Sequence, residues 1–124
     1  VEFIPDDETE IYFKAADALV LSYTHIFQSG VLFLGYNFGL PVLASDVGAF
    51  RESVVESRTG FIFRPRDAKD LAHTIERFFE SDIYRERTVR RKEIRAFALE
   101  HYSWSRAATI ITQVYSRLLG QSSV

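Results

Sequence analysis

The chain has 124 residues, 47% of them apolar and 15% aromatic, which suffices for one hydrophobic core but not for two domains. Fifteen basic and 17 acidic residues leave a net charge of −2, which excludes an overall positive field for binding nucleic acid. The chain has no cysteine, which excludes disulfides, thiolate nucleophiles and cysteine metal sites, so we expect a reducing, cytoplasmic location.

The N-terminal part of the chain predicts a strand, a helix and a second strand. Val1 to Ile4 is a short apolar run, and Pro5 with the acidic residues after it favours the start of a helix. Ala18 to Ser22 is apolar without alternation, a pattern typical of a parallel strand that is covered on both faces. Because the chain lacks an initiator methionine and opens within a strand, we expect it to be part of a longer protein.

Strands and helices continue to alternate through the middle of the chain. Ser29 and Gly30 can cap a helix that ends at Gly39, a residue suited to the left-handed turn after a helix. The elements expected in this part are a loop at 23–28, a helix at 31–38, a strand at 41–45, a turn at 46–48, a short helix at 50–55, a turn at 58–60 and a strand at 61–64.

The C-terminal half predicts helices only. Asp67 caps the first of them, with Asp70 at its third position. Two further helices are expected from Ile83 onward, with a break near residues 101–103, and the 121–123 segment is expected to be frayed. The apolar stripe of the last helix consists of Trp104, Ala108, Ile111, Val114, Tyr115 and Leu118.

Strands that alternate with helices predict an α/β fold, a Rossmann-like doubly wound parallel sheet in one domain over residues 1–124. In such a sheet the loops after the strands lie at one edge, where ligands bind. The part of the chain richest in candidate residues, 22–52, supplies two of these loops and one helix start.

Ser29 and Gly30 are the first candidates for ligand binding. A serine hydroxyl and free backbone amides at a helix N-terminus favour a bound anion, and a glycine lets a phosphate approach closely. A pyrophosphate fits that description. The alternative is that Ser29 only caps its helix, and position in the sequence alone favours this structural role.

Gly48, Glu52 and His25 are further candidates at the same edge. Gly48 permits a tight turn after the strand, and Glu52, one helical turn later, could accept hydrogen bonds from sugar hydroxyls. His25, in the preceding loop, could contact a sugar or a phosphate. Equally, Asp46 could cap the short helix while Glu52 and His25 are ordinary surface residues.

Other chemistry has little support in the sequence. We find no metal-ligand cluster, no Ser-His-Asp order, no Walker A motif and no G-x-G-x-x-G, so no metal or cofactor is expected. The basic segment, residues 85–95, could lie on anionic lipid headgroups in peripheral membrane contact or meet a partner domain, but a solvated helix face is the simpler interpretation.

Three stretches together resemble one protein family. GLPVLASDVGAFRESV, TGFIFRPRDAKDLAHTIERFF and HYSWSRAA...VYSRLL resemble, in order and spacing, the second domain of the large retaining glycosyltransferase family of group 1 type, which includes bacterial polysaccharide and sucrose-phosphate synthases. The resemblance covers nearly the whole chain and implies a GT-B fold, of which this is the C-terminal, donor-binding domain.

One departure from the family pattern concerns its two glutamates, eight positions apart. Here those positions hold Ile26 and Leu34, which cannot accept hydrogen bonds from a sugar or ribose. The chain resembles a variant subgroup in which Ser-Gly opens the helix, so the resemblance implies that Ser29 and Gly30 hold the diphosphate. The family's basic Arg and Lys pair on the donor diphosphate lies upstream of this chain, so the isolated chain is expected to be inactive.

The resemblance implies that the intact protein transfers a sugar from a UDP-, GDP- or ADP-sugar, with retention, to a glycan or lipid-linked acceptor in polysaccharide or glycoconjugate biosynthesis. It also implies an N-terminal acceptor domain, towards which the last helix would cross. Two alternatives are a GT-B nucleotide-sugar epimerase and a non-catalytic binding or scaffold domain. A receiver domain is a weaker one, because Asp46 alone does not form its acidic pocket.

Overall fold

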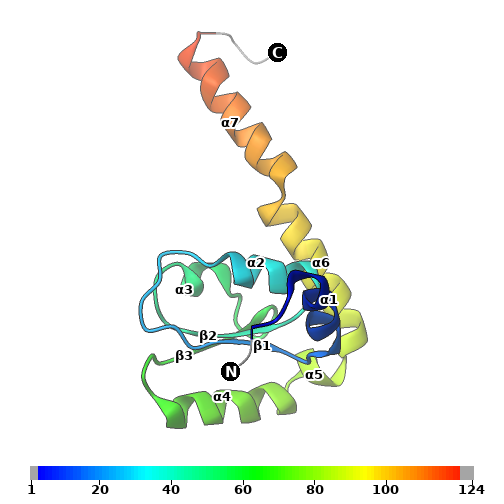
Figure 1. Ribbon diagram of the computed structural model, residues 1–124. Coiled ribbons are helices and arrows are strands. Elements are labelled where there is room, and N and C mark those ends of the chain that lie inside the picture. Colours follow the sequence, from blue (N-terminus) through cyan, green and yellow to red (C-terminus); the bar gives the residue numbers. More distant parts are fainter. Residues whose placement is uncertain (1–2, 121–124) are drawn as a thin grey trace.

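The computed structural model describes residues 3–120, which form a three-stranded parallel sheet flanked by helices (Figure 1). The strands are β1 (Leu19–Leu21), β2 (Val42–Ser45) and β3 (Gly60–Phe63), in the order β1-β2-β3. Val42, the first residue of the middle strand β2, pairs with Leu19 of β1 on one side and with Gly60 of β3 on the other. The expected α/β fold with a parallel sheet is confirmed.

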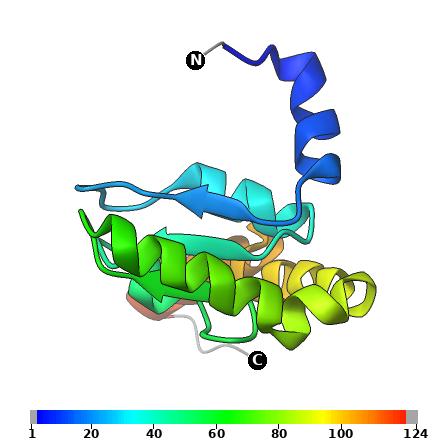
Figure 2. The same cartoon turned by 90° about the horizontal axis from the view of Figure 1, so that it is seen from below.

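Helices cover both faces of the sheet. In Figure 1, α2 and α3 lie on one side of the strands and α4 lies on the other, as in a doubly wound fold. Figure 2 shows α1 beyond the β1 edge of the sheet. The helices are α1 (Asp6–Ala15), α2 (Gly30–Asn37), α3 (Phe50–Ser53), α4 (Ala68–Glu80), α5 (Asp82–Arg85), α6 (Arg87–Tyr102) and α7 (Trp104–Leu118).

Alternate residues of β2 and β3 enter two separate cores. Val42 and Ala44 of β2 pack with α2, α3 and α6, whereas Leu43 between them packs with α4 and α5. All of β2 is buried because it is the central strand and both its faces are covered. The first core also contains Leu21, Leu32, Tyr36, Phe50, Val54, Ile94, Phe97 and Ala98, and the second contains Phe61, Phe63, Phe78 and Ile83.

Two expectations for the N-terminal part were wrong. Val20 of β1 is 44% exposed, so β1 is not covered on both faces, because the α4 core includes the neighbouring Leu43 but not Val20. Phe3 and Ile4 are not in a strand; they precede α1 and pair with no strand in the described part of the chain, and residues 1–2 lie outside it.

Most helix boundaries follow the predicted caps. The Ser29 side chain accepts a hydrogen bond from the Leu32 amide at the start of α2, and Asp67 accepts one from Asp70 at the start of α4. Gly39 follows α2 with a φ of 73°, as expected of a C-terminal glycine. The short helix α3 ends at Ser53 rather than at residue 55.

Within residues 3–120, three helices rather than two follow α4. α5 is a single turn that the sequence analysis missed, and Ile83 at its centre is buried against α4 and the sheet. The break expected near residues 101–103 is confirmed at Ser103, which caps α7. α7 extends away from the body of the molecule (Figure 1) and has no buried residue, so its apolar stripe is uncovered; the frayed end predicted at 121–123 lies outside the described residues.

A chain of hydroxyl groups crosses the first core. The Tyr36 hydroxyl donates to the Ser53 carbonyl oxygen at 2.9 Å and lies 2.8 Å from Thr59 Oγ1, which accepts from the Val55 amide at 2.9 Å. Because the Tyr36 hydroxyl proton is donated to the Ser53 carbonyl oxygen, the Thr59 hydroxyl must be the donor in its hydrogen bond with the Tyr36 oxygen. Burial raises the pKa of the Tyr36 phenol far above its usual value.

Tyr36→Phe is expected to lower the free energy of unfolding by about 1–3 kcal/mol, because it leaves the Ser53 carbonyl oxygen without this donor and the Thr59 hydroxyl proton without an acceptor. Urea unfolding followed by circular dichroism measures this change. Tyr84→Phe is the matched control, since no hydrogen bond of the Tyr84 hydroxyl is found in the described structure; an equal loss there would contradict the prediction.

The stability of the wild-type chain should also depend on pH. Because the Tyr36 phenol ionises more readily in the unfolded chain, the free energy of unfolding should fall as the pH rises above about 10.

Candidate functional site

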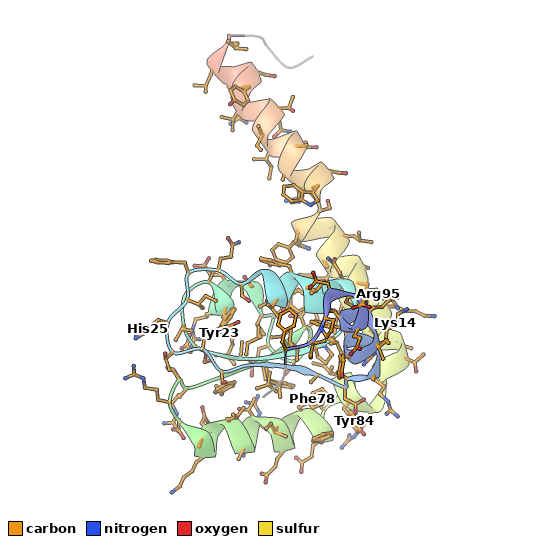
Figure 3. All side chains as sticks on the ribbon, viewed as in Figure 1. Lys14, Tyr23, His25, Phe78, Tyr84 and Arg95 are labelled. Atoms are coloured by element: carbon orange, nitrogen blue, oxygen red, sulfur yellow. The ribbon has the colours of Figure 1, made fainter. Side chains whose placement is uncertain are left out.

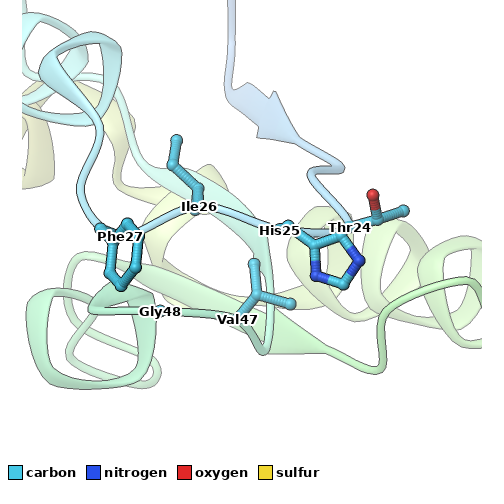
Figure 4. Close-up of a pocket in the computed structure, with 6 residues that line it drawn as sticks. All are labelled: Thr24, His25, Ile26, Phe27, Val47 and Gly48. Carbon is cyan, nitrogen blue, oxygen red and sulfur yellow. The ribbon is translucent and has the colours of Figure 1, made fainter.

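A pocket of about 520 Å³ lies at the edge of the sheet where the strands end. Two segments line it, as Figure 4 shows: the loop after β1 on one side and the turn after β2 on the other. This is the edge at which doubly wound sheets bind ligands. The lining residues are Thr24, His25, Ile26, Phe27, Val47 and Gly48.

Hydrogen bonds from the β2 end hold the loop after β1 in place. The buried Ser45 hydroxyl donates to the carbonyl oxygen of Tyr23 at 2.6 Å, and the Ala49 amide donates to the carbonyl oxygen of Phe27 at 3.1 Å. The Ile26 side chain packs against the first core. The backbone of the pocket is therefore fixed although the loop has no regular secondary structure.

Gly48 is the point at which the two segments meet. Its φ of 52° is in the left-handed region, and a Cβ there would overlap the Ile26 carbonyl oxygen and come within 3.0 Å of that of Phe27. From the sequence, this glycine was expected to permit a tight turn after the strand. The structure gives it a second role, because the loop itself occupies the space that a side chain would need.

The α2 N-terminus follows the pocket loop directly. Ser29 is buried, and its hydroxyl accepts from the Leu32 amide over 3.4 Å, so its structural role as a cap is present. Gly30 is exposed, and a Cβ there would meet nothing within 4 Å, so the space beside the first turn of α2 is open. The helix dipole favours an anion at this position.

The carboxylate at the end of β2 is neutralised. Asp46 Oδ1 accepts a hydrogen bond from Arg51 Nε at 2.9 Å, and the two side chains form an ion pair. The Arg51 guanidinium holds the pKa of the Asp46 carboxyl below its usual value. Asp46 therefore stays ionised but paired, which reduces its repulsion of an anion at this edge.

The predicted site residues are only partly brought together. His25 and Gly48 line the pocket, whereas Ser29 and Gly30 begin the helix that follows its loop. Glu52 is exposed on α3 and does not line the pocket, and within residues 3–120 it has no ion pair.

One prominent residue of the pocket, Phe27, was not among the candidates expected from the sequence. Phe27 is 95% exposed, although its carbonyl oxygen is tied to Ala49. A large aromatic ring on an anchored backbone presents a flat face to any ring that enters the pocket. The signal in the sequence was an aromatic residue between His25 and Gln28, in a loop otherwise classed only as polar.

The two positions that hold glutamate in the family pattern are apolar in structure as well as in sequence. Ile26 packs against the first core while lining the pocket, and Leu34 lies on α2 with 37% exposure. Neither side chain offers a hydrogen-bond acceptor to a ligand. The polar groups that remain near these positions are the Thr24 and His25 side chains, the Ser29 hydroxyl and the backbone amides at the start of α2.

Residues 3–120 hold neither a metal-ligand cluster nor a membrane-spanning helix. No group of three or more histidine, cysteine, aspartate or glutamate side chains in this range is arranged to hold a metal ion. Within the same range, no helix combines the length and the apolar character needed to cross a bilayer.

Comparison with known proteins identifies relatives of one kind. Residues 1–95 match the family described as glycosyl transferases group 1. The chain is 33% identical over 85 residues to a phosphatidyl-myo-inositol mannosyltransferase of Mycobacterium leprae, covering 68% of this chain and 22% of that protein. It is 31% identical over 110 residues to a D-inositol 3-phosphate glycosyltransferase of Pseudarthrobacter chlorophenolicus, covering 87% of this chain and 25% of that protein.

A solved structure agrees with the sequence relatives. A sucrose-phosphate synthase from Thermosynechococcus elongatus superposes with a TM-score of 0.78 at 26% sequence identity, covering 98% of this chain and 30% of that one. The chain thus spans about a quarter of the length of the curated relatives it matches.

Proposed function

The chain belongs to the glycosyl transferases group 1 family, and from this premise we propose that it is the donor-binding domain of a retaining glycosyltransferase. The parent protein would transfer a sugar from a UDP-, GDP- or ADP-sugar to a glycan or lipid-linked acceptor in cytoplasmic polysaccharide or glycoconjugate biosynthesis. Two relatives support this, because one is a phosphatidyl-myo-inositol mannosyltransferase and another is a D-inositol 3-phosphate glycosyltransferase.

The observation that carries the proposal is the open N-terminus of α2 beside an anchored pocket. The diphosphate of the donor would lie against Gly30 and the Ser29 cap, where the helix dipole and free amides offset its charge. As the sugar leaves, negative charge grows on the diphosphate, and groups already aimed at it stabilise that charge without reorganising.

The pocket residues have separate roles in this proposal. His25 would contact the sugar or the adjacent phosphate, and Phe27 would stack on a ring of the donor. Gly48 would keep the two pocket segments close enough to hold the donor sugar. Glu52 would reach the sugar hydroxyls only if the donor extends past the pocket towards α3.

The acceptor site would belong to an N-terminal domain of the same protein. The uncovered apolar stripe of α7 supports this arrangement, because an amphipathic helix is stable when its apolar face is buried against a partner. The isolated chain would bind the donor without transferring the sugar. No metal or other cofactor is assigned to the reaction.

A scaffold function is the second candidate, and Ile26 is the observation that favours it. Its side chain is packed into the core at a position where the family pattern has a glutamate, so the pocket has lost a polar contact. The domain would then keep its fold while the protein catalyses no sugar transfer. Failure of the full-length parent to hydrolyse or transfer from any of the three donors would favour this candidate, and a free epimerised sugar would indicate an epimerase.

The test is a calorimetric or ligand-detected NMR titration of the chain with UDP, GDP, ADP and their sugar conjugates. Ser29→Asp is expected to lower the affinity for the preferred nucleotide by about tenfold or more, because a carboxylate beside the diphosphate repels it. Aspartate caps helices as well as serine does, so α2 should remain folded, which circular dichroism checks.

Ser103→Asp is the matched control, since Ser103 caps α7 in the same way and lies away from the pocket. Equal affinity losses in both variants would contradict a diphosphate site at Ser29. If the wild-type chain binds no nucleotide, the same titration moves to the full-length parent, where absence of binding would refute the proposal.

A further inference from the structure

The structure divides the basic segment, residues 85–95, into paired and unpaired charges. The segment has six basic and two acidic side chains, a net charge of +4 in a chain whose total is −2. Arg90 contacts Glu86 and Glu93, each at 2.8 Å, and Arg91 donates to the carbonyl oxygens of Lys14 and Ala16 at the end of α1. The simpler interpretation of a solvated helix face therefore fails for Arg91, which contacts α1, whereas Arg90 pairs with exposed glutamates of the same helix surface.

Lys92 and Arg95 of α6 remain without an ion pair among the described residues. Both are exposed, and both lie on the side of α6 that faces away from the buried residues Ile94, Phe97 and Ala98. Figure 3 shows Arg95 on the opposite side of the molecule from His25, so this surface is remote from the pocket.

Exposed apolar side chains lie beside these two cations, one turn before Lys92 and one turn after Arg95. Val89 is 55% exposed and Leu99 is 67% exposed, and with Ala96 they recur at the spacing of one helix face. We define the outer stripe of α6 as Val89, Lys92, Arg95, Ala96 and Leu99. None of its members is acidic. On its flank, Glu93 is paired with Arg90, and the exposed Glu100 lies one turn beyond Ala96, 3.9 Å from the His101 ring.

We propose that the outer stripe of α6 binds the surface of an anionic lipid bilayer. Basic residues with apolar residues on one exposed helix face are typical of helices that lie in the headgroup region. The long side chains of Lys92 and Arg95 place their methylene groups beside Val89 and Leu99 while their charges reach lipid phosphates. A protein partner fits less well, because the cores of protein interfaces are depleted in lysine.

This inference is independent of the donor site, since the chain would be held at the membrane by a surface far from its pocket. Such an orientation suits a lipid-linked acceptor, but the lipid binding itself requires no catalysis. Donor titration and vesicle binding can therefore fail separately.

The test is flotation of the chain with vesicles of equal parts phosphatidylcholine and phosphatidylglycerol, and with vesicles of phosphatidylcholine alone. We expect binding to the anionic vesicles only, and its loss at high salt. The double variant Lys92→Glu, Arg95→Glu is expected to lower the partition coefficient by about tenfold or more. Val89→Ser with Leu99→Ser should lower it by a smaller factor.

The control is the double variant Arg66→Glu, Lys69→Glu, which changes the net charge equally at two exposed positions, one in the turn before α4 and one in its first turn. It should bind as the wild type does. No binding to anionic vesicles, equal binding to neutral vesicles, or an equal loss in the control would each overturn the proposal. If the glutamate variant does not fold, as judged by circular dichroism, Lys92→Gln with Arg95→Gln replaces it and must still weaken binding.

Discussion

Gly48→Ala is expected to lower the free energy of unfolding by about 2–4 kcal/mol and to weaken nucleotide binding in the protein that remains folded. The new methyl group would overlap the Ile26 carbonyl oxygen, and alanine would have to adopt a φ of 52°. The overlap and the unfavourable φ are both relieved if the turn after β2 moves away from the loop after β1. Because those two segments form the pocket, stability and binding should fall together.

Urea unfolding measures the first effect, and titration below the unfolding transition measures the second. Gly120→Ala is the matched control, because Gly120 has a φ of 68° but no atom within 4 Å of its added Cβ. Gly120→Ala therefore places alanine at a positive φ, as Gly48→Ala does, but without an overlap with neighbouring atoms. If Gly48→Ala and Gly120→Ala cost the same free energy, the close approach of the two segments is not what makes Gly48 necessary.

Features decided by neighbouring residues could be predicted from the sequence. Helix ends are one such feature, because they depend on residues within three or four positions of one another. The caps at Ser29 and Asp67 and the glycine after α2 could therefore be recognised from the sequence alone. The placement of His25 and Gly48 at one pocket follows from parallel strands, whose ends meet at one edge. These expectations required no knowledge of distant contacts.

Features decided by distant residues could not be predicted. The overlap that makes Gly48 necessary involves a loop more than twenty positions earlier, and the carbonyl oxygens that Arg91 binds belong to α1. The exposure of Val20 depends on how far α4 extends across the sheet. The exposed ring of Phe27 could be noticed in the sequence, but its fixed backbone depends on the Ala49 amide.

Gly60→Ala is expected to have the largest effect on stability, a loss of at least about 4 kcal/mol. Gly60 is the first residue of β3 and pairs with Val42 of the central strand. A Cβ there would overlap the Val42 carbonyl oxygen, which is backbone inside a fully buried strand and cannot move aside as a side chain can.

The sheet would then have to separate at the first pair of β2 and β3, where the Val42 amide also donates to the Thr59 carbonyl oxygen. Since small domains are stable by only about 5–15 kcal/mol, much of the variant should be unfolded at room temperature. Far-UV circular dichroism and urea unfolding test this, with Gly30→Ala as the control for the same added methyl group in open space. A folded Gly60→Ala with a native unfolding midpoint would mean that β2 and β3 are not held as closely as their backbones indicate. The close pairing of these strands could then not explain how the pocket segments that follow the strands are positioned.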